Sequence, residues 1–162
     1  MAGEWLQQGK PTSLGVASGV IAGLATVTPA AGFVGPFSAL VIGLVAGAAC
    51  FGAVVWKARL GYDDSLDMVG IHGIGGMIGI LAAGLFASGA INPLGADGLF
   101  FGNAGQFGIQ LVTAGVSVVF AFVGTFIILK VVDAVVGLRI TAEDEQRGLD
   151  LSQHEERAYG RD

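Results

Sequence analysis

Long runs of apolar residues without any charge dominate the sequence. No Asp, Glu, Lys or Arg occurs in residues 14–55, 68–96 or 98–129. Each run is long enough to cross a hydrocarbon core of roughly 30 Å as a helix of about 20 residues. Transmembrane strands are a poor alternative, since they need about 10 residues of alternating polarity, and these runs do not alternate. The pattern predicts an all-α integral membrane protein of about four transmembrane helices.

Proline, glycine and charge set the ends of these helices. The first run is too long for one span and should break at the turn Thr28–Gly32, which contains Pro29. Acidic side chains precede the third span, where they favour the positive end of the helix dipole. The expected spans are residues 11–28, 35–56, 65–90 and 106–136. They form a transmembrane domain over residues 1–137, followed by a tail over residues 138–162.

Composition supports a membrane location and excludes other classes. Only 13% of the residues are charged, against about 25% in soluble domains. Much of the net charge of −5 lies after Leu138, and no basic patch indicates a nucleic-acid partner. The single cysteine, Cys50, lies in an apolar run and can form no intrachain disulfide.

The positions of the basic residues predict the orientation. Loops that carry Lys and Arg stay in the cytoplasm, and the loops around Pro29 and Pro93 carry neither. The other connections and ends carry Lys10, Lys57, Arg59, Lys130 and Arg139. Both ends of the chain are therefore expected in the cytoplasm.

His72 is the ionisable residue of most interest, because it falls about two turns into the third span. On a regular helical wheel it shares a face with Met68, Gly75, Gly76, Gly79 and Ala83. This face should point into protein or a cavity and away from lipid. Ionisable groups inside a membrane usually mark a pathway. The alternative is a neutral histidine that makes one structural hydrogen bond.

Glycines recur every four residues in three spans. They are Gly15, Gly19 and Gly23, then Gly43 and Gly47, then Gly75 and Gly79. Small residues at this spacing let helix backbones approach closely, so we interpret these stripes as helix-packing surfaces that name no function.

Asp64 and Asp67 have two interpretations. Either could cap the third span, or they could belong to a pore mouth or to a structural network beside it.

The tail is either a disordered charged segment or an ordered cytoplasmic element that docks on the membrane domain or on a partner. Eleven of its 25 residues are charged. Thr141–Asp144 forms a possible capping box for a short helix that Gly148 can end, and Ser152–Glu155 offers a second box.

Several segments together resemble the ammonium transporter family (Amt/Mep/Rh). The matches run in order over nearly the whole chain: Gly9–Gly15, Ala22–Ala30, Asp63–Asp67, Gly70–Gly76, Gly137–Ile140, Arg147–Asp150 and His154–Tyr159. The segment around His72 resembles the one that bears the second of the family's two pore histidines. The tail resembles that of bacterial Amt proteins.

The resemblance implies an eleven-helix fold of two inverted five-helix repeats, assembled as a homotrimer with one pore per subunit in the inner (plasma) membrane. This chain would correspond to helices eight to eleven and the cytoplasmic tail. His72 would line the pore, with Ile21 and Met68 beside it, although the family usually has a smaller aliphatic residue at the latter position. Asp64 and Asp67 would be structural residues near the pore. The regulatory tail would include Arg139, Gly148, Asp150, His154 and Tyr159.

The implied activity is transport of ammonium or ammonia without covalent catalysis, so we predict no enzyme, metal or cofactor. The family's first pore histidine and its aromatic gate have no counterpart here, and we expect the chain to be inactive alone. A truncated gene or one half of a split protein would both explain this. Two alternatives remain: a membrane-anchored docking module for a PII-type nitrogen-regulatory protein, and an inert fragment.

Overall fold

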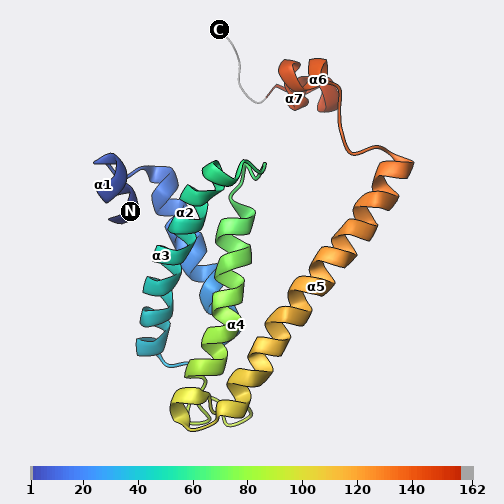
Figure 1. The fold of residues 1–162 in the computed structure, drawn as a ribbon. Helices are drawn as coiled ribbons and strands as arrows, with labels where there is room; N and C mark the ends of the chain where they lie inside the picture. The colour runs from blue at the N-terminus through green and yellow to red at the C-terminus, as the bar shows by residue number, and fades with distance from the viewer. Residues whose placement is uncertain (1, 158–162) are drawn as a thin grey trace. The chain divides into compact units, whose positions relative to one another are not determined.

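The computed structural model describes residues 2–157, and the described residues form helices and loops (Figure 1). The α-helices are α1 (Ala2–Gln8), α2 (Ser13–Val27), α3 (Pro36–Leu60), α4 (Ile74–Phe86), α5 (Ala104–Val135), α6 (Ala142–Arg147) and α7 (Leu149–His154). Three short helices of tighter or wider pitch are η1 (Thr28–Ala30), η2 (Val69–Gly73) and η3 (Leu99–Phe101).

The described chain contains four helices that are long and apolar enough to cross a membrane. They cover Ser13–Ala30, Pro36–Leu60, Val69–Phe86 and Ala104–Val135. The expectation of four spans is therefore confirmed, with differences at the ends. The second span continues to Leu60, beyond the expected residue 56. The third is shorter than residues 65–90, because the segment before Val69 bends and the segment after Phe86 turns back.

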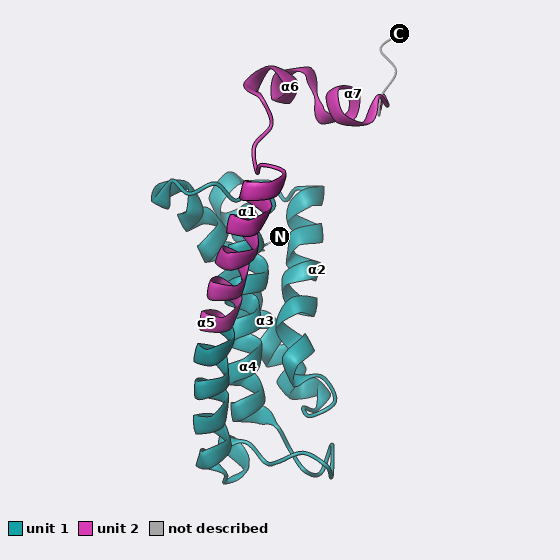
Figure 2. Cartoon of the chain, turned by 90° about the vertical axis from the view of Figure 1, so that its right-hand side faces the viewer, with its two compact units in different colours: residues 1–117 teal, residues 118–162 magenta. Residues whose placement is uncertain are grey.

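The chain divides into two compact units, residues 1–117 and 118–162 (Figure 2). In the first unit α2, α3 and α4 pack against one another, and Figure 1 shows them side by side. Two small apolar clusters hold them together. One contains Ala30, Ile42, Ala82 and Ala83, and the other contains Ala22, Cys50 and Ile71.

Glycine permits the close approach of α4 to its neighbours. A β-carbon on Gly75 would lie 2.7 Å from Thr26 Oγ1 and 3.4 Å from Cys50 Sγ. A β-carbon on Gly79 would lie 2.9 Å from Pro29 Cδ. The packing expected of glycine stripes is thus confirmed on α4.

The stripes on α2 and α3 behave differently. A β-carbon on Gly19, Gly23, Gly43 or Gly47 would meet nothing within 4 Å among the described residues. Gly15 does have a neighbour, but it is the carboxylate of Glu4 from α1 and not another span. For these glycines, helix packing stays a prediction.

A short helix before the first span, α1, was not expected from the polar N-terminal sequence. Glu4 of α1 reaches the start of α2, where its carboxylate accepts hydrogen bonds from Thr12 Oγ1 (2.7 Å) and Thr12 N (3.3 Å). The Thr12 hydroxyl oxygen in turn accepts from Gly15 N (2.9 Å) and caps α2. Both hydrogen bonds from Thr12 lower the pKa of Glu4, and the one from the hydroxyl has the larger effect.

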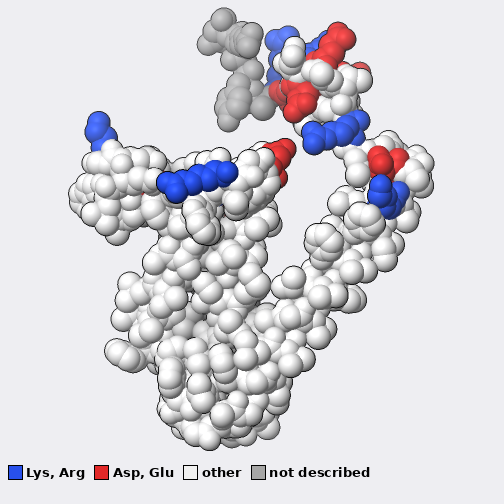
Figure 3. All heavy atoms as spheres, in the orientation of Figure 1, with Lys and Arg blue, Asp and Glu red and all other residues white. Residues whose placement is uncertain are grey.

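The connections at the Pro29 and Pro93 end of the first unit are tied together. Ser88 N donates to the Phe33 carbonyl oxygen (2.9 Å), and Gly98 N donates to the Ala87 carbonyl oxygen (2.7 Å). Gly89 N donates to Asp97 Oδ1 (2.7 Å). The last turn of α3, at the other end of that helix, carries Lys57 and Arg59, and Figure 3 shows charged side chains gathered at one end of this unit. The orientation expected from the basic residues stays a prediction.

The second unit contains the end of α5 and the tail helices. Thr141 caps α6 as expected: its hydroxyl oxygen accepts from Asp144 N (3.1 Å). Gly148 follows α6 with a φ of +97°, as expected for a glycine at a helix end. The second capping box is wrong, because α7 already begins at Leu149 and Ser152 lies inside it. The Ser152 hydroxyl instead donates to the Asp144 carbonyl oxygen (3.3 Å).

Candidate functional site

The third span opens with a turn of π-helix, η2, and His72 lies in it. A π turn has hydrogen bonds from residue i to i+5, so it holds one more residue than an α turn. Such turns are rare and are found frequently at functional sites. The candidate site is therefore this turn with the residues that fix it in place.

Asp64 fixes the start of the turn. Its two carboxylate oxygens accept hydrogen bonds from Met68 N and Val69 N, each at 2.9 Å. Two backbone N–H groups that the helix itself leaves without acceptors are thus satisfied, and the negative charge stands at the positive end of the helix. The structure gives Asp64 a capping contact.

Asp67 occupies an unusual conformation just before the turn. Its φ is +55°, a left-handed conformation that costs an L-residue roughly 1–2 kcal/mol. Its carboxylate is paired with the ammonium group of Lys57, near the end of α3. The same ammonium group donates to the Asp64 carbonyl oxygen (2.6 Å). Asp67 is therefore held from outside its own segment.

The buried side of the turn is Ile71. Its side chain is 6% exposed and packs with Ala22 and Cys50. The Cys50 thiol donates to the Ile71 carbonyl oxygen at 3.7 Å. A β-carbon on the adjacent Gly70 would lie 3.0 Å from Val54 Cγ2, so the turn fits closely against α3.

His72 is exposed in the described chain, whereas Gly75, Gly79 and Ala83 are buried. Met68, predicted on the same face, is exposed as well, so the shared face stays a prediction. The π turn affects this face, since one additional residue before α4 displaces the preceding residues by one position on the wheel. Gly70 and Ile71 are the buried residues of the turn.

The two residues expected beside His72 are also exposed. Ile21 is 44% exposed and Met68 is 50% exposed. Ile21 precedes Ala22, and Ala22 packs with Ile71, the residue before His72. The structure thus places the middle of α2 beside the π turn, and Met68 immediately precedes that turn.

The expected tail residues lie in the second unit, and Tyr159 lies outside the described residues. Arg139 precedes α6, Gly148 separates α6 from α7, Asp150 is in the first turn of α7, and His154 is its last residue. The tail contains the short helices α6 and α7, and its docking on the membrane domain or on a partner stays a prediction.

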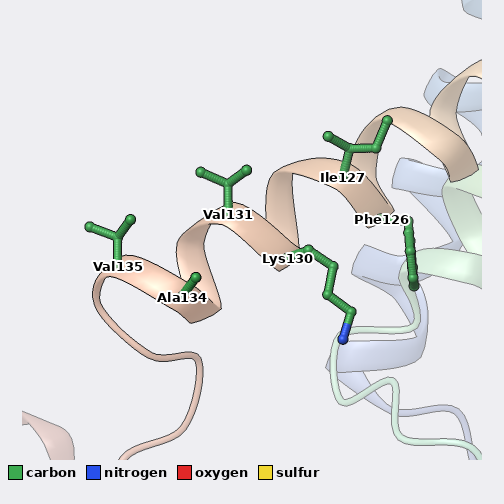
Figure 4. Close-up of a pocket in the computed structure, with 6 residues that line it drawn as sticks. All are labelled: Phe126, Ile127, Lys130, Val131, Ala134 and Val135. Carbon is green, nitrogen blue, oxygen red and sulfur yellow. The ribbon is translucent and has the colours of Figure 1, made fainter.

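The end of α5 presents an exposed apolar face with one cation. Figure 4 shows a shallow hollow lined by Phe126, Ile127, Lys130, Val131, Ala134 and Val135. Lys130 Nζ lies 5.8 Å from the centre of the Phe126 ring, within the range of a cation–π contact. An open face of one helix encloses no substrate, so we place the candidate site at η2.

Sequence reasoning missed the π turn and the Lys57–Asp67 pair. A regular wheel assumes 3.6 residues per turn throughout, and nothing in the residue types marks the wider turn. The pair had a weak signal, because Lys57 interrupts an apolar helix end ten residues before an acid. Within residues 2–157, no group of three or more His, Cys, Asp or Glu side chains is placed to hold a metal ion.

These features define a multi-pass helical membrane protein with a histidine in an irregular turn of one span. The model of the "Ammonium Transporter Family" matches residues 1–159. The chain belongs to the ammonium transporter family.

Relatives and solved structures agree with this assignment. The chain is 51% identical over 157 residues to an ammonium transporter of Bacillus subtilis, covering 96% of this chain and 39% of the relative. It is 50% identical over 155 residues to ammonium transporter Amt1 of Archaeoglobus fulgidus, with the same coverages of 96% and 39%. The crystal structure of Saccharomyces cerevisiae Mep2 superposes with a TM-score of 0.81 at 38% identity, covering 88% of this chain and 34% of that chain. The chain thus spans less than two fifths of the length of these proteins.

Proposed function

We propose that this chain supplies the His72-bearing helices of an ammonium transporter, and that ammonium or ammonia passes along a path lined by His72. The observation that carries the proposal is the placement of His72. It lies in an irregular turn that is capped by Asp64 and packed through Ile71, while its own side chain stays exposed. Membership of the ammonium transporter family supplies the substrate class.

The physical chemistry of ammonium favours such a group. A bare ammonium ion in a dry pore loses its hydration at a large cost in free energy, whereas neutral ammonia does not. A neutral imidazole donates a hydrogen bond from one ring nitrogen and accepts one at the other. His72 can therefore contact ammonia or take part in moving a proton, and transport requires no covalent step.

Ile21 and Met68 are proposed to line the same path. Both side chains are about half exposed. Met68 immediately precedes the π turn, and Ile21 is next to Ala22, which packs against Ile71 of that turn. Apolar side chains at these positions would keep the path dry, which disfavours the charged form of the substrate.

The assembly and location follow from the same proposal. We expect a homotrimer in the inner (plasma) membrane, with both ends of this chain cytoplasmic. The gathering of basic residues at one end of the first unit supports this orientation. The glycines on α2 and α3 that have no neighbours here would find packing partners in further helices.

The test uses a chimera, in which this chain replaces the corresponding segment of the Bacillus subtilis relative. His72→Ala should reduce or alter ammonium-dependent current and internal pH change in liposomes, with expression and oligomer size unchanged. His154→Ala is the matched control, because His154 is the only other histidine and lies in the tail. Unchanged current and proton coupling in His72→Ala would leave His72 as a packing residue. We expect the 162-residue chain alone to give no saturable response.

A second candidate function is docking of a PII-type regulatory protein on the tail. It is favoured by the helical pair α6–α7, in which the Asp144 carbonyl oxygen receives the Ser152 hydroxyl, while Leu149 stays 49% exposed. Binding of a purified PII-type protein to the full chain in micelles, lost when residues 141–162 are deleted, tests this function independently of transport.

A further inference from the structure

An ion pair joins the end of α3 to the residue just before the π turn. The Lys57 ammonium group contacts the Asp67 carboxylate and also donates to the Asp64 carbonyl oxygen at 2.6 Å. Both side chains are partly buried, at 22% and 27% exposure. One side chain of α3 thus holds two backbone positions of the segment that leads into η2.

Asp67 needs such an external contact to keep its conformation. Its φ of +55° lies in the left-handed region, which Asp and Asn tolerate better than most residues but glycine alone adopts freely. Non-glycine residues persist there when the surroundings over-determine them. The Lys57 ion pair and the bond from Asp67 N to the Asp64 carbonyl oxygen (3.2 Å) supply those surroundings.

The contact continues from Asp67 to His72 through the backbone. The Asp67 carbonyl oxygen accepts from Ile71 N at 2.8 Å, so Asp67 fixes the direction in which the turn begins. Ile71 faces the cluster of Ala22 and Cys50, and His72 is the next residue. A change at Asp67 that rotated the turn would move Ile71 off this cluster and re-aim His72.

We propose that Lys57 and Asp67 are positioning residues for His72: their ion pair holds the left-handed Asp67, and the turn that starts there sets the direction of the imidazole. The consequence for transport rests on the proposed function of His72, whereas the effect of the ion pair on the direction of the imidazole does not. The competing interpretation is a loop staple that stabilises the segment and leaves His72 unaffected.

The test observes His72 itself. The chain is prepared with ring-¹⁵N-labelled histidine and His154→Gln, so that His72 is the only histidine in the spectrum. Lys57→Met and Asp67→Asn remove one charge each. Arg59→Met and Asp63→Asn are matched controls. Within the described part of the chain Arg59 forms no ion pair, and the one side-chain hydrogen bond of Asp63 is from the Ser65 hydroxyl, at 3.4 Å.

The expected result has three parts. Lys57→Met and Asp67→Asn shift the His72 ring resonances and speed hydrogen exchange at the Ile71 amide by about fivefold, the effect of losing a pair of this exposure. The double variant shows no larger change than either single variant, since both remove the same pair. Lys57→Arg, which keeps the charge, restores the parent spectrum.

The proposal is overturned if Lys57→Met and Asp67→Asn give the same His72 resonances and Ile71 exchange as the two controls. If either variant fails to fold by circular dichroism, Asp67→Gly is measured as well: glycine adopts this conformation without the ion pair, so the His72 resonances should stay at their parent positions, and shifted resonances would overturn the proposal. Ammonium flux in the chimera is measured separately. Shifted His72 resonances with unchanged flux would contradict the proposed function of His72 and leave the positioning role standing.

Discussion

Gly79 of α4 lies directly against the carbonyl oxygen of Thr26 in α2, with no space between them for a β-carbon. The same β-carbon would also lie 2.9 Å from Pro29 Cδ, at the beginning of η1. Thr26 is fully buried at this contact. The crossing of these two helices is therefore set by backbone against backbone.

Replacing Gly79 should disturb this crossing. Gly79→Ala forces α4 away from α2, and we expect a loss of about 1–3 kcal/mol in unfolding free energy, the usual cost of overpacking. Gly76→Ala is the control on the same helix, because a β-carbon there meets nothing within 4 Å. It should be neutral or stabilising by up to about 1 kcal/mol from helix propensity. Denaturant titration in micelles, followed by circular dichroism, measures both. Equal effects would mean that the α2–α4 contact is not this close.

The start of α6 gives a second prediction. Thr141→Ala removes the hydroxyl that accepts from Asp144 N, which should destabilise α6 by about 1 kcal/mol. Thr141→Ser keeps the hydroxyl and should behave like the parent. Amide hydrogen exchange at Asp144 and Glu145 measures the effect. Identical exchange in Thr141→Ala and Thr141→Ser would show that the cap does not form in solution.

The contact of α1 with α2 should depend on pH through Glu4. Hydrogen bonds from Thr12 lower the pKa of Glu4 below its ordinary value of 4.5. The stabilisation is therefore complete above about pH 4.5 and is lost as the pH falls through the lowered pKa. Trp5 is adjacent and 60% exposed, so its fluorescence anisotropy should fall with this release in a Trp56→Phe variant. Glu4→Gln should show no such transition, and a transition that persisted in it would rule out Glu4 as the titrating group.

The orientation can be read by thiol labelling. Cysteines at Ala31 and Ala96, which are both exposed loop positions, should react with a membrane-impermeant reagent from outside in a Cys50→Ala background. A cysteine at Ser65, beside the basic end of α3, should react only after the membrane is opened. The reverse pattern would place both ends of the chain outside.

The spans could be predicted from the sequence because each depends on a long local property, the absence of charge. The capping of α6 by Thr141 was also local, and it was predicted correctly. The side of the third span that His72 occupies was not predictable in this way. It depends on the π turn η2, which no local pattern marks: Lys57 of α3 pairs with Asp67 before the turn, and Cys50 of α3 donates to the Ile71 carbonyl oxygen within it.

The glycine stripes show the same distinction. Spacing identified Gly75 and Gly79 together with Gly19 and Gly43, although only the first two have close neighbours in the described chain. The four-residue spacing of glycines shows that one face of a helix carries small residues. Which faces meet is decided by tertiary contacts that no single-helix pattern contains.

The additional residue in η2 also determines which side chain occupies the buried position. In a continuous α-helix each residue is rotated by about 100° about the helix axis, so the imidazole of His72 would turn toward the buried position that Ile71 occupies. Without that additional residue, a hydrogen-bonding ring would stand in an apolar environment beside Ala22. The irregular turn thus keeps the apolar side chain of Ile71 buried while the next residue, His72, stays exposed.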